Sequence, residues 1–116
     1  MDRLFVYGSL QPGGDNEHIL APLNGTWEAG SVRGNLAEEG WGAGLGYPGL
    51  HIDESGPPVP GYLFSSERLT DFWPELDEFE GQEYQRCRIE VTLESGGKVS
   101  AQVYAIRAAG SQSRDP

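Results

Sequence analysis

The sequence has a single cysteine, Cys87, and only two histidines, His18 and His51. A lone cysteine excludes an internal disulfide and a thiolate-rich zinc site. The histidines show neither an HExxH motif nor a paired spacing, so we expect no dedicated metal site. Cys87 itself lies in the strand-like run RCRIEVTLE, which indicates a buried and unreactive thiol.

Basic residues are also scarce, because 8 Lys and Arg stand against 18 Asp and Glu and leave a net charge of −10 at pH 7. Nucleic acids and anionic membranes attract proteins largely through Lys and Arg, so neither is an expected partner. No stretch approaches the roughly 18 consecutive apolar residues of a membrane-spanning helix. The N-terminal MDRLFVYGSL lacks the features of a signal peptide. We therefore expect a cytoplasmic location.

The length of 116 residues allows one folded domain. We assign this domain to residues 1–107 and expect the polar segment 108–116 to be a disordered tail. With 17 glycines and 8 prolines, the chain favours short elements joined by turns. The glycine-rich residues 40–50 are expected to form a loop, and residues 51–60 a turn-rich segment.

Short apolar runs bounded by Gly and Pro predict strands over 3–7, 26–36, 61–65, 86–94 and 98–107. The last two runs alternate apolar and polar residues around Ser95-Gly96-Gly97, which is typical of a hairpin. A short helix is expected at 16–23. A second helix is expected to start after a Ser66 cap and to end before Gly81, with Pro74 dividing it into two pieces that meet near Trp73.

Helical spacing after Pro74 places Leu76, Phe79 and Glu80 on one side. The two apolar residues define the buried side, so the carboxyl group of Glu80 is expected to point inward. Burial raises the pKa of a carboxyl group, and a raised pKa suits a general acid or base at neutral pH. Two structural alternatives are that Glu80 reaches solvent at the helix end or pairs with Arg86.

The segment VYGSL, residues 6–10, ends a strand in Gly8 and Ser9. Backbone N–H groups beyond the last ladder bond are able to hold a carboxylate or an oxyanion. An ordinary exit from the strand is the alternative. Ser9 has no recognisable base beside it, and no phosphate-binding glycine motif is present.

Tyr84 and Arg86 are two residues apart on an extended segment and therefore share a face. They follow Glu80 closely, so a phenol and a guanidinium group are able to order a substrate or the base. The alternative is a core tyrosine whose hydroxyl is satisfied by the fold.

Together these segments resemble the γ-glutamylcyclotransferase-like superfamily, which includes the AIG2-like and γ-glutamylamine cyclotransferase proteins. The resemblance runs from residue 4 to about residue 107. The matching segments are LFVYGSLQPGGDNEHIL, YPGL at 47–50, VPGYLF at 59–64 and LDEFEGQEYQR at 76–86.

This resemblance implies an α+β fold, a small mixed β-barrel with short peripheral helices. It places the family's signature glutamate at Glu80 and implies that Tyr7, Gly8, Ser9 and Leu10 bind the glutamyl end of a small-molecule substrate. Tyr84 and Arg86 are candidate substrate-binding residues beside them. The implied reaction is intramolecular aminolysis of a γ-glutamyl amide or peptide, giving 5-oxoproline and an amine or amino acid, with no metal or other cofactor.

Two other functions remain open from the sequence. The same fold is able to serve as a non-catalytic module that binds a small molecule, and an acidic surface is able to serve as a protein-interaction adaptor. Both a monomer and a homodimer are compatible with the chain.

Overall fold

The computed structural model describes residues 2–38 and 46–106, so the predicted tail and residues 40–45 of the predicted loop lie outside the described residues. The elements follow in this order: β1 (Asp2–Val6), two 3₁₀ helices, η1 (Glu17–Ile19) and η2 (Ala21–Leu23), β2 (Thr26–Ala37), β3 (Gly49–Ile52), β4 (Pro58–Ser66), α1 (Leu69–Glu80), β5 (Tyr84–Leu93) and β6 (Lys98–Ile106).

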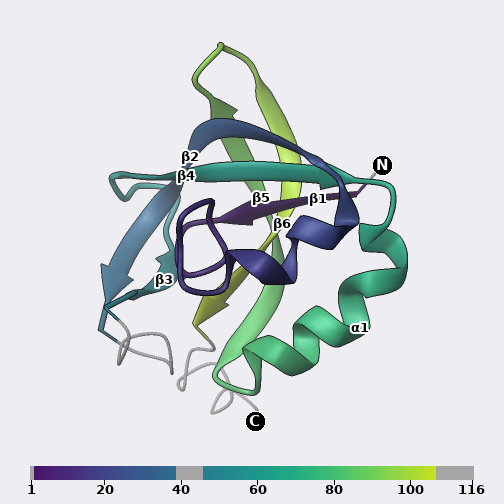
Figure 1. Cartoon of the computed structure of the whole chain (residues 1–116). Helices are drawn as coiled ribbons and strands as arrows, with labels where there is room; N and C mark the ends of the chain where they lie inside the picture. Colours follow the sequence, from purple (N-terminus) through teal and green to yellow (C-terminus); the bar gives the residue numbers. More distant parts are fainter. Residues whose placement is uncertain (1, 39–45, 107–116) are drawn as a thin grey trace, which may run out of the picture.

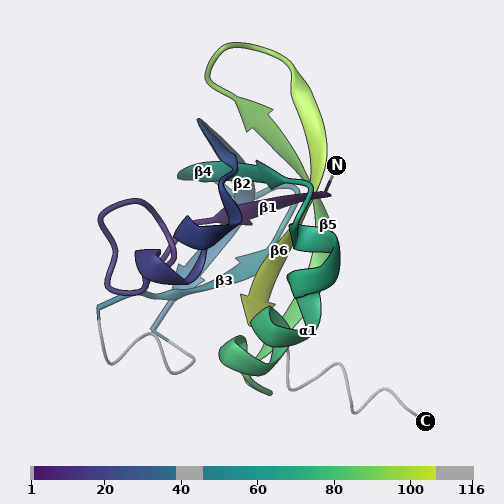
Figure 2. The same ribbon diagram turned by 45° about the vertical axis from the view of Figure 1, so that its right-hand side comes forward.

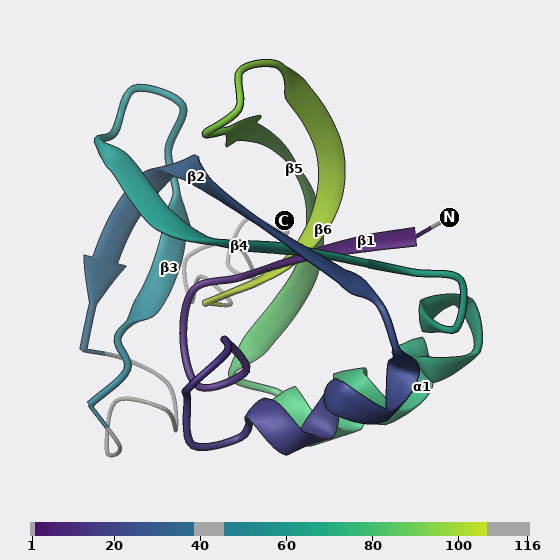
Figure 3. The same ribbon diagram turned by 45° about the horizontal axis from the view of Figure 1, so that its top comes forward.

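Five strands close into a barrel in the order β2, β4, β1, β6, β5, with β5 pairing back onto β2 (Figures 1 and 3). The pair β1–β6 is parallel and the other pairs of the barrel are antiparallel. The short strand β3 adds to the free side of β2. The α+β, mixed-barrel fold implied by the resemblance is therefore confirmed.

Strand β1 lies between β4 and β6, and its second half, residues 4–6, is buried on both faces. Leu4 packs in a cluster with residues of α1 and the 3₁₀ helices, whereas the next residue, Phe5, packs in a second cluster inside the barrel. Successive side chains of a strand point to opposite faces, so one apolar run joins both clusters. This position brings the end of β1 close to the helical side of the barrel.

Helix α1 is one continuous helix beside β5, not the two pieces expected from Pro74 (Figures 1 and 2). An interior proline costs a helix about 3 kcal/mol. Here Pro74 lies on the exposed side, while Trp73 and Leu76 on either side of it are buried against the barrel. Packing of the apolar face thus outweighs the local penalty.

Two further expectations are corrected. Residues 16–23 form the 3₁₀ helices η1 and η2 instead of one helix. The expected turn-rich segment 51–60 contains the end of β3 and the start of β4. Pro58 and Pro60 are tolerated in β4 because that part of the strand pairs with β2 alone and has no second neighbour to which an N–H must donate.

Ser66 ends β4 instead of capping α1 directly, and the helix starts at Leu69. The buried Ser66 hydroxyl donates to the carbonyl oxygen of Leu23 at 2.9 Å and accepts from the N–H of Arg68 at 3.1 Å. One side chain therefore links η2, β4 and the approach to α1.

We expect Ser66→Ala to lower the free energy of unfolding by about 1–3 kcal/mol, because it leaves two polar backbone groups without their partner. Urea unfolding measures this loss. The neighbouring Ser65→Ala, on the other face of β4, is the matched control and should change stability by less than about 0.5 kcal/mol. Equal effects of the two substitutions would contradict the assigned role of Ser66.

Candidate active site

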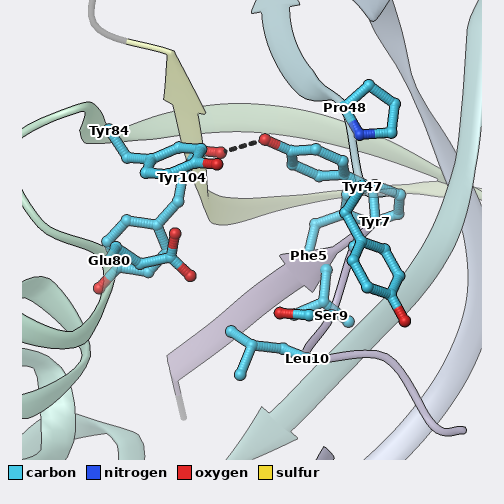
Figure 4. A pocket seen from close by; sticks show the side chains of 11 residues that line it. Phe5, Tyr7, Ser9, Leu10, Tyr47, Pro48, Glu80, Tyr84 and Tyr104 are labelled. Atoms are coloured by element: carbon cyan, nitrogen blue, oxygen red, sulfur yellow. Dashed lines mark hydrogen bonds between the residues drawn. The ribbon is translucent and has the colours of Figure 1, made fainter. Parts of the chain in front are cut away.

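A cavity lies where the end of β1 meets the last turn of α1 and strands β5 and β6. Figure 4 shows Glu80 on one side of it and Ser9 and Leu10 on the other. Its lining combines one carboxyl group with aromatic and backbone groups: Phe5, Val6, Tyr7, Gly8, Ser9, Leu10, Tyr47, Pro48, Glu80, Tyr84 and Tyr104. The fold thus gathers six of the seven predicted site residues around one space.

The turn after β1 is held through its carbonyl groups. The carbonyl oxygen of Gly8 accepts from the N–H of Gln11 at 3.1 Å, and that of Ser9 accepts from the N–H of Asn16 at 2.8 Å. The Ser9 hydroxyl accepts from the side-chain amide of Asn16 at 3.0 Å. Within residues 2–38 and 46–106, the N–H groups of Gly8, Ser9 and Leu10 have no acceptor. Because these three residues line the cavity, their N–H groups are candidate donors to a ligand.

Glu80 is the last residue of α1 and, with 8% of its surface exposed, is buried on the same side as Leu76. The inward direction predicted from helical spacing is confirmed. Burial raises the pKa of the Glu80 carboxyl group to about 7. A carboxyl group with this pKa exchanges a proton readily at neutral pH, as a general acid or base must.

The Tyr7 hydroxyl connects segments that are distant in sequence. It donates to the carbonyl oxygen of Tyr104 at 2.6 Å (Figure 4). It also accepts from the N–H of Leu50 at 3.1 Å. Burial raises the pKa of Tyr7, and the nearby Glu80 raises it further. Tyr7 therefore stays neutral while Glu80 titrates, and it serves to hold β3 and β6 at the rim of the cavity.

Arg86 is the predicted site residue that does not line the cavity. Its guanidinium group pairs with Asp77, with Nε at 3.0 Å from Oδ1 and Nη2 at 3.2 Å from Oδ2, and lies over the Trp73 ring at 4.6 Å. Arg86 therefore lies outside the cavity and contacts helix α1. Tyr84, two residues earlier on β5, does line the cavity.

Five lining residues were not among the predicted site residues, namely Phe5, Val6, Tyr47, Pro48 and Tyr104. Tyr47 and Pro48 belong to the YPGL segment, which was available as a signal. Tyr104 offered no local signal, because its place depends on pairing between β5 and β6 and on α1. Burial, followed by its hydrogen bond to the Asp77 carboxylate, raises the pKa of Tyr104.

Among the described residues, no group of three or more His, Cys, Asp and Glu side chains is arranged to hold a metal ion. No described helix has the length and hydropathy needed to cross a membrane. Cys87 is half-buried against the barrel core.

The sequence profile of the family described as "Gamma-glutamyl cyclotransferase, AIG2-like" matches residues 4–116. Because this match covers nearly the whole chain, the protein belongs to that family. No curated protein matches the sequence.

Solved structures share the fold. An AIG2-like protein from Mus musculus superposes with a TM-score of 0.68 at 25% identity, covering 95% of this chain and 81% of the other. YkqA from Bacillus subtilis gives a TM-score of 0.71 at 23% identity, covering 99% of this chain but 44% of the other. A structure titled "Gamma-glutamyl cyclotransferase" gives a TM-score of 0.63 at 13% identity, covering 91% of this chain and 67% of the other.

The raised pKa of Glu80 predicts a pH dependence of stability. Between its ordinary value of 4.5 and about 7, the folded protein keeps a proton on Glu80 that the unfolded chain has lost. This contribution to stability is therefore fully present below pH 4.5 and is lost as the pH rises through 7. Relative to Glu80→Gln, wild type should lose about 3 kcal/mol of unfolding free energy over this range.

Urea unfolding of both proteins at a series of pH values measures this difference. The contributions of all other titrating groups cancel when the unfolding free energy of Glu80→Gln is subtracted from that of wild type. Glu78→Gln, in the same turn of α1 but exposed, is the control and should follow the wild-type pH profile. A wild-type minus Glu80→Gln difference that stays flat from pH 4.5 to 8 would contradict the burial of an ionising Glu80.

Proposed function

We propose that the protein catalyses intramolecular aminolysis of a γ-glutamyl amide or peptide, giving 5-oxoproline and a free amine or amino acid. The observation that carries this proposal is that one cavity is lined by a buried carboxyl group and by three successive residues whose backbone N–H groups have no acceptor in the described part of the chain. Membership in the γ-glutamyl cyclotransferase, AIG2-like family supports it.

The reaction forms one carbon–nitrogen bond, which closes the ring, and breaks another, which releases the amine. Glu80, as the carboxylate, takes a proton from the α-ammonium group of the substrate, and the resulting amine attacks the γ-carbonyl carbon. The attacking nitrogen loses a second proton as the lactam forms. The bond from the carbonyl carbon to the leaving nitrogen breaks, and both protons pass in turn through Glu80 to this nitrogen, so the amine leaves in its ammonium form. No water is consumed, and every group that acts belongs to the chain or to the substrate.

The cavity has groups for both the glutamyl end and the reacting centre of the substrate. The N–H groups of Gly8, Ser9 and Leu10 hold the glutamyl end and stabilise the oxyanion that develops on the carbonyl oxygen. The aromatic rings of Tyr84 and Tyr104 form the wall on the side of Glu80 (Figure 4). Because nucleophile and carbonyl belong to one molecule, the main task of the protein is to hold the substrate in the folded, ring-closing conformation.

Arg86 is left out of the direct contacts with substrate because it lies outside the cavity lining. One chain supplies all the residues used here, so the reaction as proposed works in a monomer and in a homodimer alike. A small, freely diffusing γ-glutamyl compound in the cytoplasm is the proposed substrate.

We expect Glu80→Gln to lower 5-oxoproline formation by about 10²–10⁴-fold, since the amide cannot act as a base. The assay is mass detection of 5-oxoproline from γ-glutamyl amino acids, γ-glutamyl amines, ε-(γ-glutamyl)lysine and glutathione. Glu78→Gln should keep wild-type activity. Equal product from wild type and Glu80→Gln would remove Glu80 from the reaction, and ligand binding without turnover in wild type would favour a non-catalytic module.

The pH profile of kcat/KM offers a second check. Glu80 acts in its ionised form, so kcat/KM on the best substrate should fall below about pH 7 as the carboxylate takes up a proton. Steady-state rates between pH 5 and 9 measure this acidic limb. A limb centred near the ordinary glutamate pKa of 4.5 would contradict the buried state of the base.

A further inference from the structure

Glu80 occupies a position at which helices are usually weakest. It is the final residue of α1, and Gly81, with φ of 84°, ends the helix directly after it. Terminal turns fray, and an ionised carboxylate gains several kcal/mol by reaching water. Something must therefore hold this last turn against the barrel so that Glu80 stays in the cavity.

Asp77, one turn before Glu80, makes the contacts that do this. Its Oδ1 accepts from the Tyr104 hydroxyl of β6 at 2.6 Å and forms an ion pair with Arg86, on β5, whose Nε lies 3.0 Å away. Its Oδ2 accepts from Nη2 of Arg86 at 3.2 Å. Its backbone oxygen accepts from the N–H of Gly81 at 3.0 Å. One residue thus joins the end of the helix to two strands of the barrel.

Arg86 braces the same turn from its outer side. Its guanidinium group contacts Asp77 with two nitrogens and also lies 4.6 Å over the ring of Trp73, one turn earlier in α1. The side chains of Arg86 and Asp77 remain 30% and 44% exposed. A pair this exposed adds little to global stability, so its effect is on local geometry.

We propose that Asp77, held by Arg86, is a positioning residue that fixes the last turn of α1 to Tyr104 and thereby keeps Glu80 inside the cavity. Asp77 does not line the cavity and touches no substrate. Its catalytic consequence rests on the proposed function, whereas its effect on Glu80 does not. The polar side chains that share the cavity with Glu80 are Tyr7, Tyr47, Tyr84, Tyr104 and Ser9, and the Asp77–Arg86 pair lies outside the cavity.

Asp77→Ala tests this position directly, since alanine is the best helix former and any loss cannot come from helix propensity. The carboxyl carbon of Glu80, labelled with carbon-13, reports the ionisation of this residue by NMR without any substrate. We expect the Glu80 pKa to fall by at least about one unit from its value near 7, because the loosened turn lets water reach the carboxylate.

Tyr104→Phe is the second variant, since it removes the hydroxyl that Asp77 accepts from but keeps the ring and the backbone oxygen that holds Tyr7. It should shift the Glu80 pKa in the same direction by a smaller amount, and it carries the test if Asp77→Ala does not fold. Glu78→Ala, in the same turn, is the matched control and should leave the Glu80 titration at its wild-type position.

Kinetics add a readout that a merely structural role would not move. For the substrate found above, kcat of Asp77→Ala should fall about 10–100-fold with little change in KM, and the acidic limb should move to lower pH with the Glu80 titration. Asp77→Glu, which keeps the charge, should restore part of kcat.

The two proposals fail in different ways. If wild type forms no 5-oxoproline from any of the γ-glutamyl compounds, the proposed reaction fails, but the NMR titration still decides the role of Asp77. If Glu80 titrates identically in folded wild type, Asp77→Ala and Tyr104→Phe, the positioning role is overturned whatever the activity. If the variants melt at a lower temperature but the pKa of Glu80 is unchanged, the positioning role is likewise overturned.

Discussion

The cavity depends on two hydrogen bonds of one phenol. The Tyr7 hydroxyl accepts from the N–H of Leu50 and donates to the carbonyl oxygen of Tyr104, so the turn after β1 is tied to β3 and β6 at once. No ladder of the described sheet joins β3 to β6. The link adds to the β1–β6 ladder and joins the turn after β1 to β3 as well, so it helps to fix the N–H groups of residues 8–10 relative to Glu80.

The electrostatic environment of Glu80 depends on this arrangement of strands. Once β1, β5 and β6 are held in place, aromatic side chains surround Glu80 and exclude water from it. The whole chain carries ten net negative charges, yet the charge that matters for chemistry is the one placed where ionisation is unfavourable. The acidic composition is therefore a property of the surface, whereas the chemistry of the site depends on the raised pKa of Glu80.

Local patterns predicted the parts of the site that local geometry controls. Helical spacing is sufficient to turn Glu80 inward, and the short apolar run before Gly8 is sufficient to locate β1, which ends at Val6. Tyr104 and the true partner of Arg86 were beyond such patterns, because they depend on strands that meet α1 only in the folded chain. Pro74 and Pro58 were misjudged for a related reason: burial of neighbours and the lack of a second partner strand decide whether a proline is tolerated.

The parallel pairing of β1 with β6 has a consequence for how the molecule comes into being. The first strand of the sheet needs the last one, and Tyr7 needs an oxygen 97 positions further along the chain. Closing a loop of that size is slow compared with forming a helix or a hairpin. During synthesis on the ribosome, the β5–β6 hairpin has to emerge before the barrel is able to close, so the pocket is among the last features of the protein to form.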